Sequence, residues 1–536
     1  MKPDTNREKS LRLFSLALIA MLVLFSSVVS YKQHKEKKTA HMQTAAPLPV
    51  QTDLSSEPPL LPSDEPVSGS DAVSPTDTHP DGVSDVPSVQ PAQPERPLEE
   101  TVKIKYIRIT VAANVRKDKS AGSDKLTTLQ KGAEVEYVSE SGDRYQIRFG
   151  GSTLGWIPKK YGELLEKEVV IRHIAVFTGG DPIDMKDTKE GDTIGRILKN
   201  HATMGASVAV IRNGQVAYHY EYGYADKEKK KTVNENTKFR IASVTKVFTA
   251  MMAMRQVDDG LLDLDKDLSD YLGFKVRNPS YKQAITMRML LTHTSGLVDH
   301  EEDMYSKGIR NVLSQKDFYN GPPGQNFLYS NLGMGVAGAV MEKTSKQCIS
   351  EYAQAAFFKP MGIDAAFDAK YLSDKSQIAN CYLGTQINRS SKYLARPQAV
   401  GKPGATYHLT AGGLLISGKD LAKVFTLLLN NGQYDGKTYL SRTALDEMMK
   451  TQLVPKGKNF NQCLGLRQKD KLLGNRNFYY HNGIAYGVYS LMAIDPSDKS
   501  GIVVITSGAD GKRNENTLFA VCEDVMTYCY SEEFPS

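Results

Sequence analysis

Ser243 and Lys246 lie three residues apart in the stretch FRIASVTKVFTAMMAM, where the apolar pattern predicts the start of a buried helix. At this spacing the two side chains share one helix face, so the amine can take the proton of the serine hydroxyl. The amine is useful as a base only if burial or a neighbouring cation lowers its pKa. An N-cap serine followed by a surface lysine is the alternative, but a lysine is costly on a helix with apolar neighbours nearly all round.

Tyr329 and Asn331 form a second polar pair, at the end of a Pro/Gly-rich loop and just before another apolar helix, in GPPGQNFLYSNLGMGVAGAV. Residues two apart on an extended segment point to the same side. In a serine hydrolase the tyrosine could pass a proton to the leaving group, and the asparagine could hold Lys246 and the substrate amide. A turn tyrosine followed by a capping asparagine is the alternative interpretation.

His481, Asn482 and Gly483 form the third group, at the entry to the predicted strand IAYGVYSLMAID. Such a strand edge can lie beside an acyl group, and the glycine permits a close approach of backbone. A single histidine at such a position is more often structural than catalytic.

The order SxxK, YxN, HxG resembles the serine β-lactamase and penicillin-binding protein superfamily. The blocks FRIASVTKVFTAMM, LLTHTSGL, PPGQNFLYSN, AGGLLISGKDLAKV and YYHNG resemble its class C β-lactamase-related group, which includes DD-peptidases, esterases and β-lactamases. The resemblance runs from about Ala206 to Glu523. It implies that Ser243 is the acylating nucleophile, that Lys246 activates it, and that Tyr329 is the partner base that also activates the deacylating water.

The same resemblance assigns binding roles to the other motif residues. Asn331 would orient the substrate, His481 stands where many relatives have lysine, and the backbone N–H groups of Ser243 and Ile484 would form the oxyanion hole. Asn482 replaces a frequent threonine or serine, and Ile484 replaces a frequent second glycine after Gly483. These departures put the substrate class in doubt, but they do not affect the fold or the nucleophile.

His293, in the LLTHTSGL block, belongs to a recurring part of the pattern, and we interpret it as loop architecture without a catalytic role.

The surrounding sequence predicts one α/β (α+β) domain over residues 186–536. An alternating stretch around Asn213-Gly214 predicts a hairpin, and two further strands are expected near the C-terminus, in YGVYSLMAID and GIVVITSG. Helical segments lie between them. We therefore expect strands from both ends to join one antiparallel sheet, flanked by helices and a helical subdomain, which is the β-lactamase/transpeptidase-like fold that the resemblance implies.

Residues 101–165 show short alternating runs separated by turns, which predicts a small β-barrel. The segments NVR, LQKGAEVEYV, YQIRF and GWIPKKY resemble a bacterial SH3 domain, which implies a module that holds the cell wall or another partner. Trp156 could line a ligand groove, although a barrel core position is favoured. A connector is expected over residues 166–185.

The first 100 residues predict a membrane attachment. Residues 13–31 form an uncharged apolar run long enough to cross a bilayer, and we favour an uncleaved transmembrane anchor over a signal peptide. Residues 1–12 would be a cytoplasmic tail. Residues 32–100 hold half of the 24 prolines and no Phe or Trp, and they predict a disordered linker.

Charge and cysteine content argue against several other classes of protein. The formal net charge is +6, and the first 40 residues carry nearly all of it, so no basic face indicates nucleic-acid binding. Five cysteines without CxxC spacing suggest neither a zinc site nor a disulfide framework. We expect no metal and no cofactor.

Together these patterns predict a membrane-anchored, extracytoplasmic serine hydrolase with its N-terminus in the cytoplasm and an acyl-enzyme mechanism. A DD-peptidase acting on cell-wall peptides ranks first, a D-alanyl or other wall esterase second, and a β-lactamase third. A non-catalytic cell-wall-binding scaffold is the alternative of another class. The SH3 region is expected to bind the wall, with a mere spacer as the alternative.

Overall fold

The computed structural model describes residues 99–149, 153–299, 309–313, 318–388, 391–394, 409–514, 516 and 518–535. The predicted tail and anchor lie outside these residues, as does the predicted linker except for Glu99 and Glu100, which open strand β1. Within the described residues, no helix is both long and apolar enough to cross a bilayer.

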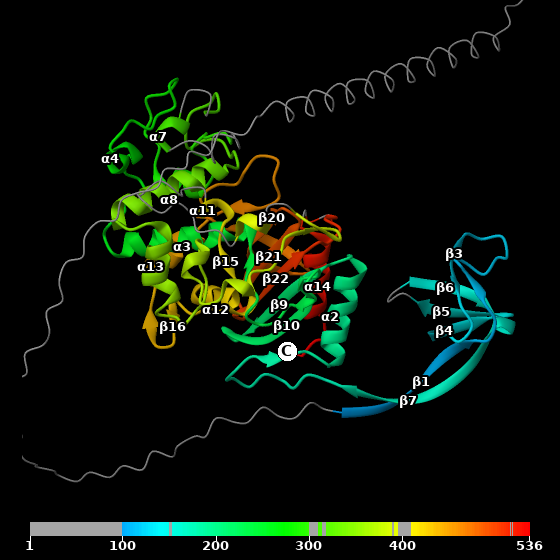
Figure 1. Ribbon diagram of the computed structural model, residues 1–536. Helices are drawn as coiled ribbons and strands as arrows, with labels where there is room; N and C mark the ends of the chain where they lie inside the picture. Colours follow the sequence, from blue (N-terminus) through cyan, green and yellow to red (C-terminus); the bar gives the residue numbers. More distant parts are fainter. Residues whose placement is uncertain are drawn as a thin grey trace, which may run out of the picture. The chain divides into compact units, whose positions relative to one another are not determined.

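The N-terminal part is a seven-stranded antiparallel sheet with the order β3-β2-β6-β5-β4-β1-β7 (Figure 1). Its small core gathers alternate residues of these strands, among them Ile107, Val115 and Ile157. The strands β1 and β7 pair antiparallel over their whole lengths, so the β-structure continues to Arg172, into the segment expected to be a connector. The strands are β1 (Glu99–Ile109), β2 (Ala113–Arg116), β3 (Lys125–Leu129), β4 (Glu134–Ser141), β5 (Arg144–Phe149), β6 (Thr153–Pro158) and β7 (Gly162–Arg172).

Trp156 does not occupy the core position that was favoured for it. Side chains alternate between the two faces of a strand. On β6 the neighbours Gly155 and Ile157 are buried, so Trp156 lies on the other face, where it is half-buried. The Lys119 ammonium lies 5.2 Å from the centroid of its ring. Because Trp156 is only half-buried, the groove interpretation stays open.

The C-terminal part is built on a nine-stranded sheet with the order β11-β10-β9-β22-β21-β20-β19-β18, to which β8 adds beside β10. All pairs are antiparallel except β8 with β10. The strands are β8 (Ile183–Asp184), β9 (Gly205–Arg212), β10 (Gln215–Asp226), β11 (Lys231–Thr232), β18 (Asn461–Gln462), β19 (Arg467–Leu473), β20 (Arg476–Ala485), β21 (Val488–Asp495) and β22 (Ser500–Ser507).

The expected strand pairs are confirmed. Asn213 and Gly214 both have positive φ, 50° and 75°, and join β9 to β10 in a tight hairpin. The C-terminal strands β21 and β22 pair with each other, and β22 also pairs with β9. Strands from both ends of the domain therefore form the centre of one sheet, as the alternating patterns predicted.

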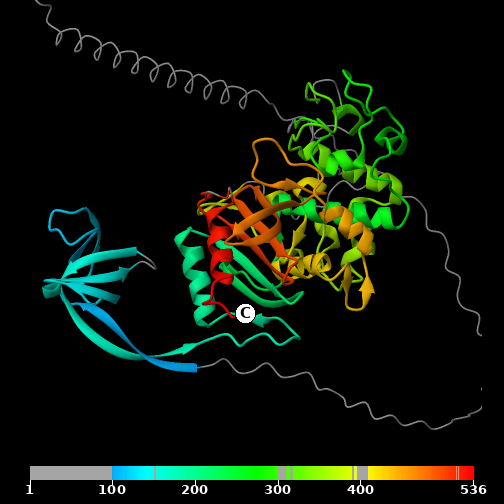
Figure 2. The same cartoon turned by 180° about the vertical axis from the view of Figure 1, so that it is seen from behind.

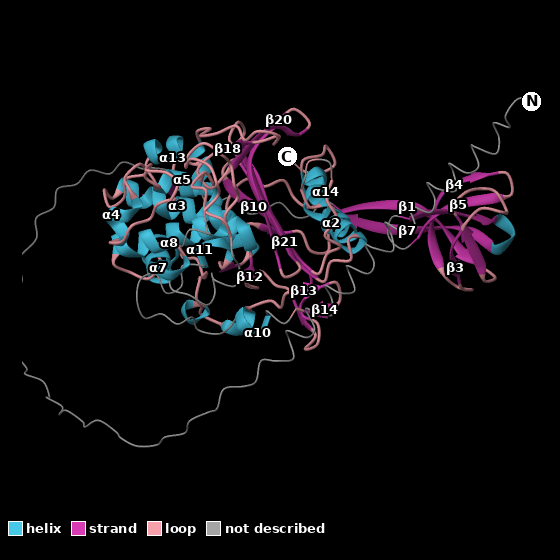
Figure 3. Cartoon of the chain, turned by 90° about the horizontal axis from the view of Figure 1, so that it is seen from above, coloured by secondary structure: helices cyan, strands magenta, loops and turns pink. Residues whose placement is uncertain are grey.

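Helices cover both faces of this sheet. Val208 and Val210 of β9 belong to the core under α2 and α14, whereas Ala209 and Ile211 belong to the larger core on the side of α3 and α12. Figure 2 shows α14 beside α2, and Figure 3 shows most of the other helices gathered on one side of the long strands. The helices are α2 (Lys189–Asn200), α3 (Thr245–Asp258), α4 (Leu268–Leu272), α5 (Met287–Leu291), α7 (Ile309–Val312), α8 (Asn331–Ser345), α9 (Ile349–Ala353), α10 (Ser391–Leu394), α11 (Leu409–Gly412), α12 (Gly418–Leu429), α13 (Arg442–Met449) and α14 (Ala520–Cys529).

Short elements complete the domain. Two-residue strands pair as β12 (Phe239–Arg240) with β15 (Leu415–Ile416), β13 (Tyr382–Leu383) with β14 (Gln386–Ile387), and β16 (Gln433–Tyr434) with β17 (Lys437–Thr438).

Helix α3 is buried nearly all round, as its apolar sequence predicted. Eleven of its 14 residues are buried, and Lys246 is one of them. A lysine in such a helix requires polar partners, because an isolated charge in the interior is strongly unfavourable.

Candidate active site

Ser243 lies in a single 3₁₀ turn, Ala242–Val244, between β12 and α3. The residue before it, Ala242, is buried and has a φ of 49°, a left-handed conformation that is unfavourable for a residue with a Cβ. The surrounding packing must therefore hold this turn in place, as is common at functional sites. The turn leaves the Ser243 side chain half-buried, facing a cleft.

Lys246 is fully buried, and three oxygens surround its amine. Nζ lies 3.1 Å from Ser243 Oγ, 2.8 Å from Asn331 Oδ1 and 2.5 Å from the carbonyl oxygen of Ala411. The amide and carbonyl oxygens can only accept hydrogen bonds. A neutral amine could donate one N–H group to each of them and use its lone pair to accept the proton of Ser243. The sequence prediction that these two side chains face each other is therefore confirmed by the geometry.

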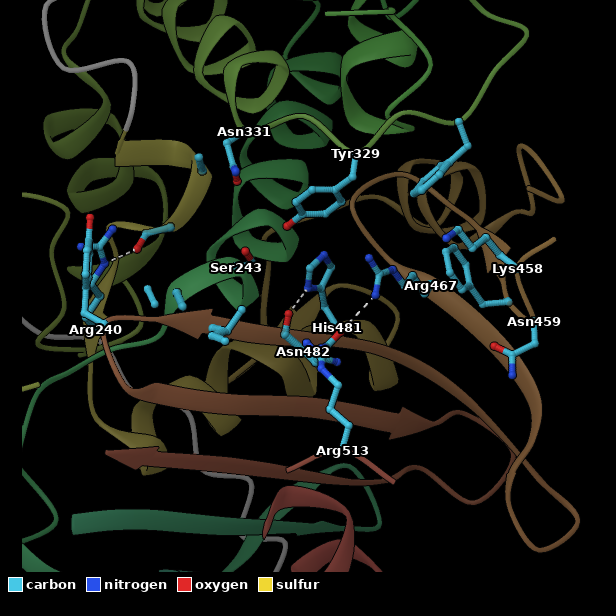
Figure 4. Close-up of a pocket in the computed structure, with 18 of the residues that line it drawn as sticks. Arg240, Ser243, Tyr329, Asn331, Lys458, Asn459, Arg467, His481, Asn482 and Arg513 are labelled. Atoms are coloured by element: carbon cyan, nitrogen blue, oxygen red, sulfur yellow. Dashed lines mark hydrogen bonds between the residues drawn. The ribbon is translucent and has the colours of Figure 1, made fainter. Parts of the chain in front are cut away.

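Tyr329 and Asn331 both face the cleft, but the segment is not extended throughout. Ser330 is extended and caps α8, with its Oγ accepting from the N–H of Gly333, and Asn331 is the first residue of the helix. Figure 4 shows the Tyr329 hydroxyl pointing toward Ser243 and His481. The Lys246 amine lies 4.9 Å from the Tyr329 ring centroid.

Asp299 is a site residue that the motifs did not reveal. Its Oδ2 accepts from the backbone N–H and the side-chain Nδ2 of Asn331, both at 2.9 Å. Its Oδ1 accepts from Ser330 Oγ at 3.0 Å and from the Leu332 N–H at 2.8 Å. The carboxylate thus caps α8 and fixes the Asn331 amide with its oxygen toward Lys246. The one signal in the sequence is its position, because Asp299 is a carboxylate two residues after the LLTHTSGL block.

The third motif lies on β20, directly beside the nucleophile turn. A Cβ built on Gly483 would lie 2.7 Å from the Ile241 carbonyl oxygen and 3.0 Å from the Ser243 nitrogen, so only glycine fits. Ser490 of β21, which pairs with Gly483 of β20, donates its hydroxyl to that same carbonyl at 2.8 Å. Ile484 lines the cleft and is 53% exposed. The backbone N–H groups of Ser243 and Ile484 remain the predicted oxyanion hole.

His481 is buried, and its Nδ1 lies 2.8 Å from the carbonyl oxygen of Asn482. A carbonyl only accepts, so Nδ1 carries the proton and Nε2 is left as an acceptor in the neutral ring. Burial, reinforced by the positive charge of Arg467, holds the pKa of His481 well below its usual range. His481 is therefore neutral at pH 7.

His293 packs against the segment that carries Tyr329, which agrees with its interpretation as a structural loop residue. It is buried, it accepts from the Ser330 N–H at 3.2 Å, and its ring centroid lies 4.4 Å from that of Tyr329. Burial holds the pKa of His293 well below its usual value. The Tyr329 ring thus has two neutral imidazoles near it, since the His481 ring centroid is 6.5 Å away.

The cleft has a volume of about 1070 Å³ and includes residues that no motif indicated. Arg467, on β19, donates to Asn482 Oδ1 at 3.0 Å, and its guanidinium carbon lies 5.8 Å from the Tyr329 ring centroid. These residues come from segments far apart in the sequence and carry no spacing signal. The additional lining residues with large side chains are Arg240, Phe327, Lys458, Phe460, Arg467, Tyr486 and Arg513.

In the part of the chain that the structure describes, one group of three side chains has metal-ligand spacing: Asp184, His219 and Glu221. None of them lines the cleft, and His219 Nδ1 lies 2.9 Å from Glu221. The expectation of a metal-free mechanism stays a prediction.

Comparison with known proteins covers both parts of the chain. The Beta-lactamase family model matches residues 191–521, and the Bacterial SH3 domain model matches residues 111–163. Protein flp of Staphylococcus aureus (strain MRSA252) is 23% identical over 317 residues, which cover 56% of this chain and 59% of that protein. Esterase EstB of Burkholderia gladioli is 31% identical over 186 residues, 31% of this chain and 47% of that one. The chain thus spans about 59% of the length of protein flp.

Solved structures show the same fold. The hydrolase EstCE1 matches with a TM-score of 0.52 and 20% identity, over 63% of this chain and 98% of that chain. D-amino acid amidase from Ochrobactrum anthropi SV3 matches with a TM-score of 0.51 and 24% identity, over 64% and 97%. Since the Beta-lactamase model covers more than half of the sequence, the chain belongs to the Beta-lactamase family, and it carries a bacterial SH3 domain ahead of that domain.

Proposed function

We propose that this protein is a serine hydrolase that works through an acyl-enzyme on Ser243. The observation that carries the proposal is the buried Lys246 amine, 3.1 Å from Ser243 Oγ and held by two neutral oxygens. A buried lysine with this arrangement has a ready role as the base that activates the serine.

In the proposed reaction, Lys246 takes the Ser243 proton while Oγ forms a bond to the substrate carbonyl carbon. The carbonyl oxygen gains the negative charge, which the N–H groups of Ser243 and Ile484 stabilise. The charge returns to the carbonyl as the bond to the leaving group breaks, and that group takes a proton through the Tyr329 hydroxyl. Water then attacks the acyl carbon of the acyl-enzyme while Tyr329 passes one of the water's protons to Lys246, and Lys246 returns that proton to Ser243 Oγ as the ester bond breaks.

Among substrates, we place cell-wall peptides first, with the protein acting as a DD-peptidase like the penicillin-binding proteins. A wall esterase is the second candidate, supported by the similarity to Esterase EstB. A β-lactamase ranks third. The leaving group that the enzyme accepts depends on the shape of the pocket. In this chain the third motif, which borders the pocket, departs from the usual pattern at Asn482 and Ile484.

We also propose that residues 13–31 anchor the protein in the cell membrane with the catalytic domain outside. The support is the length and apolar character of that run. The SH3 domain would hold the enzyme near the cell wall, for which the half-exposed Trp156 is a candidate contact.

The test is intact-mass spectrometry of the full chain, incubated separately with a fluorescent penicillin and with an activated ester, beside Ser243→Ala. A stable penicillin adduct that is lost in the variant supports the DD-peptidase. Ester turnover without a lasting penicillin adduct supports the esterase. No reaction with either reagent would overturn the hydrolase proposal in favour of the scaffold.

A further inference from the structure

The cleft is strongly biased toward positive charge. Among its described lining residues are the basic side chains of Arg240, Lys458, Arg467 and Arg513, and no aspartate or glutamate. Like charges that share a cleft repel one another, so this arrangement is costly unless an anion is bound. The whole chain has nearly balanced charges outside its first 40 residues, so the bias belongs to the cleft rather than to the composition.

The positive charges lie on both sides of the nucleophile. In Figure 4, Arg240 lies on one side of Ser243, while Arg467 and Lys458 lie on the other. If the scissile carbonyl of a substrate lies at Ser243, the acyl part of the substrate therefore lies near a cation on one side, and its leaving group lies near a cation on the other.

These cations are available to a ligand. Within the described part of the chain, no carboxylate forms an ion pair with Arg240, Lys458 or Arg467. Arg240 uses Nε to donate to the Gly412 carbonyl at 2.7 Å, and its guanidinium carbon lies 4.7 Å from the Tyr486 ring centroid. These contacts fix the guanidinium without neutralising it.

Arg467 is held in a similar way. Its guanidinium carbon lies 4.7 Å from the Phe460 ring centroid, and Nη1 donates to Asn482. Its Nε is buried and has no hydrogen-bond partner among the described residues. A planar guanidinium fixed by an aromatic ring suits an anionic group with two oxygens, such as a carboxylate or a phosphate.

We propose that the cleft selects substrates that carry an anionic group on each side of the scissile bond. This inference rests on the proposed function, because it requires Ser243 to be acylated. It narrows the substrate class from any wall ester or peptide to one with acidic groups flanking the bond.

The experiment compares matched esters with the full chain. On the acyl side, 4-nitrophenyl hemiglutarate is compared with neutral 4-nitrophenyl pentanoate. On the leaving-group side, 3-carboxyphenyl butyrate is compared with 3-carbamoylphenyl butyrate, and a 3-phosphonophenyl ester distinguishes phosphate from carboxylate. We expect kcat/KM to be about tenfold higher for the anionic member of each pair at low salt. At about 1 M salt, where the Debye length is about 3 Å, the preference should largely disappear.

Two variants test which cation is responsible. Each of the variants Lys458→Gln and Arg240→Gln should lower the ratio of kcat/KM for the anionic ester to kcat/KM for the neutral ester. Each variant should do so more for one of the two ester pairs, acyl-side or leaving-group-side, than for the other. The matched control is Lys437→Gln, an exposed residue of β17 outside the cleft lining, which should keep both ratios. Lys458 is exposed, so its variant should fold even if the Arg240 variant does not.

Equal kcat/KM values within both pairs, or ratios that neither salt nor Lys458→Gln changes, would overturn the inference while leaving the hydrolase proposal intact. No turnover of any ester, with no acyl adduct on Ser243, would instead overturn the proposed function and the inference that depends on it.

Discussion

Replacing Asp299 by asparagine removes one charge and keeps the shape of the side chain. In the protein, Oδ2 accepts from two N–H groups of Asn331, and Oδ1 accepts from Ser330 Oγ and the Leu332 N–H. Asparagine has one oxygen, which can keep the Oδ1 pair. Its NH₂ group would then face the two N–H groups of Asn331, and donors cannot pair with donors.

The substitution should lower both the stability of the protein and the rate of acylation. Leaving two donors without an acceptor costs about 1–3 kcal/mol each, so we expect Asp299→Asn to lose about 2–6 kcal/mol of unfolding free energy. The Asn331 amide can escape by turning over, but its NH₂ then faces Lys246, which loses an acceptor. A buried donor left without an acceptor costs about 1–3 kcal/mol, which corresponds to a roughly 5- to 150-fold fall in the acylation rate.

The assay is the rate of acylation by an activated ester, followed by stopped-flow absorbance, with thermal unfolding measured on the same sample. Asp267→Asn is the matched control, because Asp267 caps α4 by accepting from the Ser269 N–H and pairs with Arg277. It should lower stability but not acylation. If Asp299→Asn lost stability to a similar degree and acylated at the wild-type rate, Asp299 would be only a helix cap.

Two further predictions concern the geometry and the pH dependence of the site. Gly483→Ala should lower kcat by about 10²–10³, because its Cβ would push β20 away from Ser243. Gly122→Ala is the control and should not change kcat, since its Cβ would meet no atom closer than 4.0 Å. Burst kinetics of ester hydrolysis measure this, and an unchanged kcat in Gly483→Ala would contradict the close approach. His293 and His481 have lowered pKa values when folded, so the unfolded chain binds more protons, and stability should fall below about pH 6.5 by up to about 1.4 kcal/mol per pH unit for each histidine. Denaturant unfolding across this range measures the slope, and His481→Gln should reduce it; a stability independent of pH there would refute the neutral, buried state.

The elements that the sequence predicted best are those whose signal is local. The hairpin at Asn213-Gly214 follows from two residues that tolerate positive φ, and the burial of α3 follows from its apolar run. The partners of Lys246 were predicted only in part. Asn331 was expected from its motif, but the Ala411 carbonyl is a backbone group 165 residues away, and no residue type indicates it.

The remaining differences have physical causes of the same kind. Asn331 was expected on an extended segment, but Ser330 and Asp299 supply acceptors for the free N–H groups of a helix start, so α8 begins there. Trp156 was expected in a core, but the alternation along β6 depends on Gly155 facing inward, which apolar patterns do not reveal. Arg467 reaches the cleft through strand pairing between β19 and β20, which a single sequence specifies poorly.

The placement of Asn331 between Asp299 and Lys246 shows how a buried lysine can be held firmly and still suit the role of base that we propose for it. A carboxylate in direct contact with the amine would favour the ammonium form, which has no lone pair with which to take the Ser243 proton. The amide oxygen of Asn331 is neutral, as is the Ala411 carbonyl, so both fix the direction of the amine without binding its charge as strongly. Asp299 acts on the other end of the same amide, and it therefore contributes position rather than charge to Lys246. His481, beside Tyr329, is likewise neutral, and the basic side chains among the described lining residues lie on the walls of the cleft, where we propose that substrate binds.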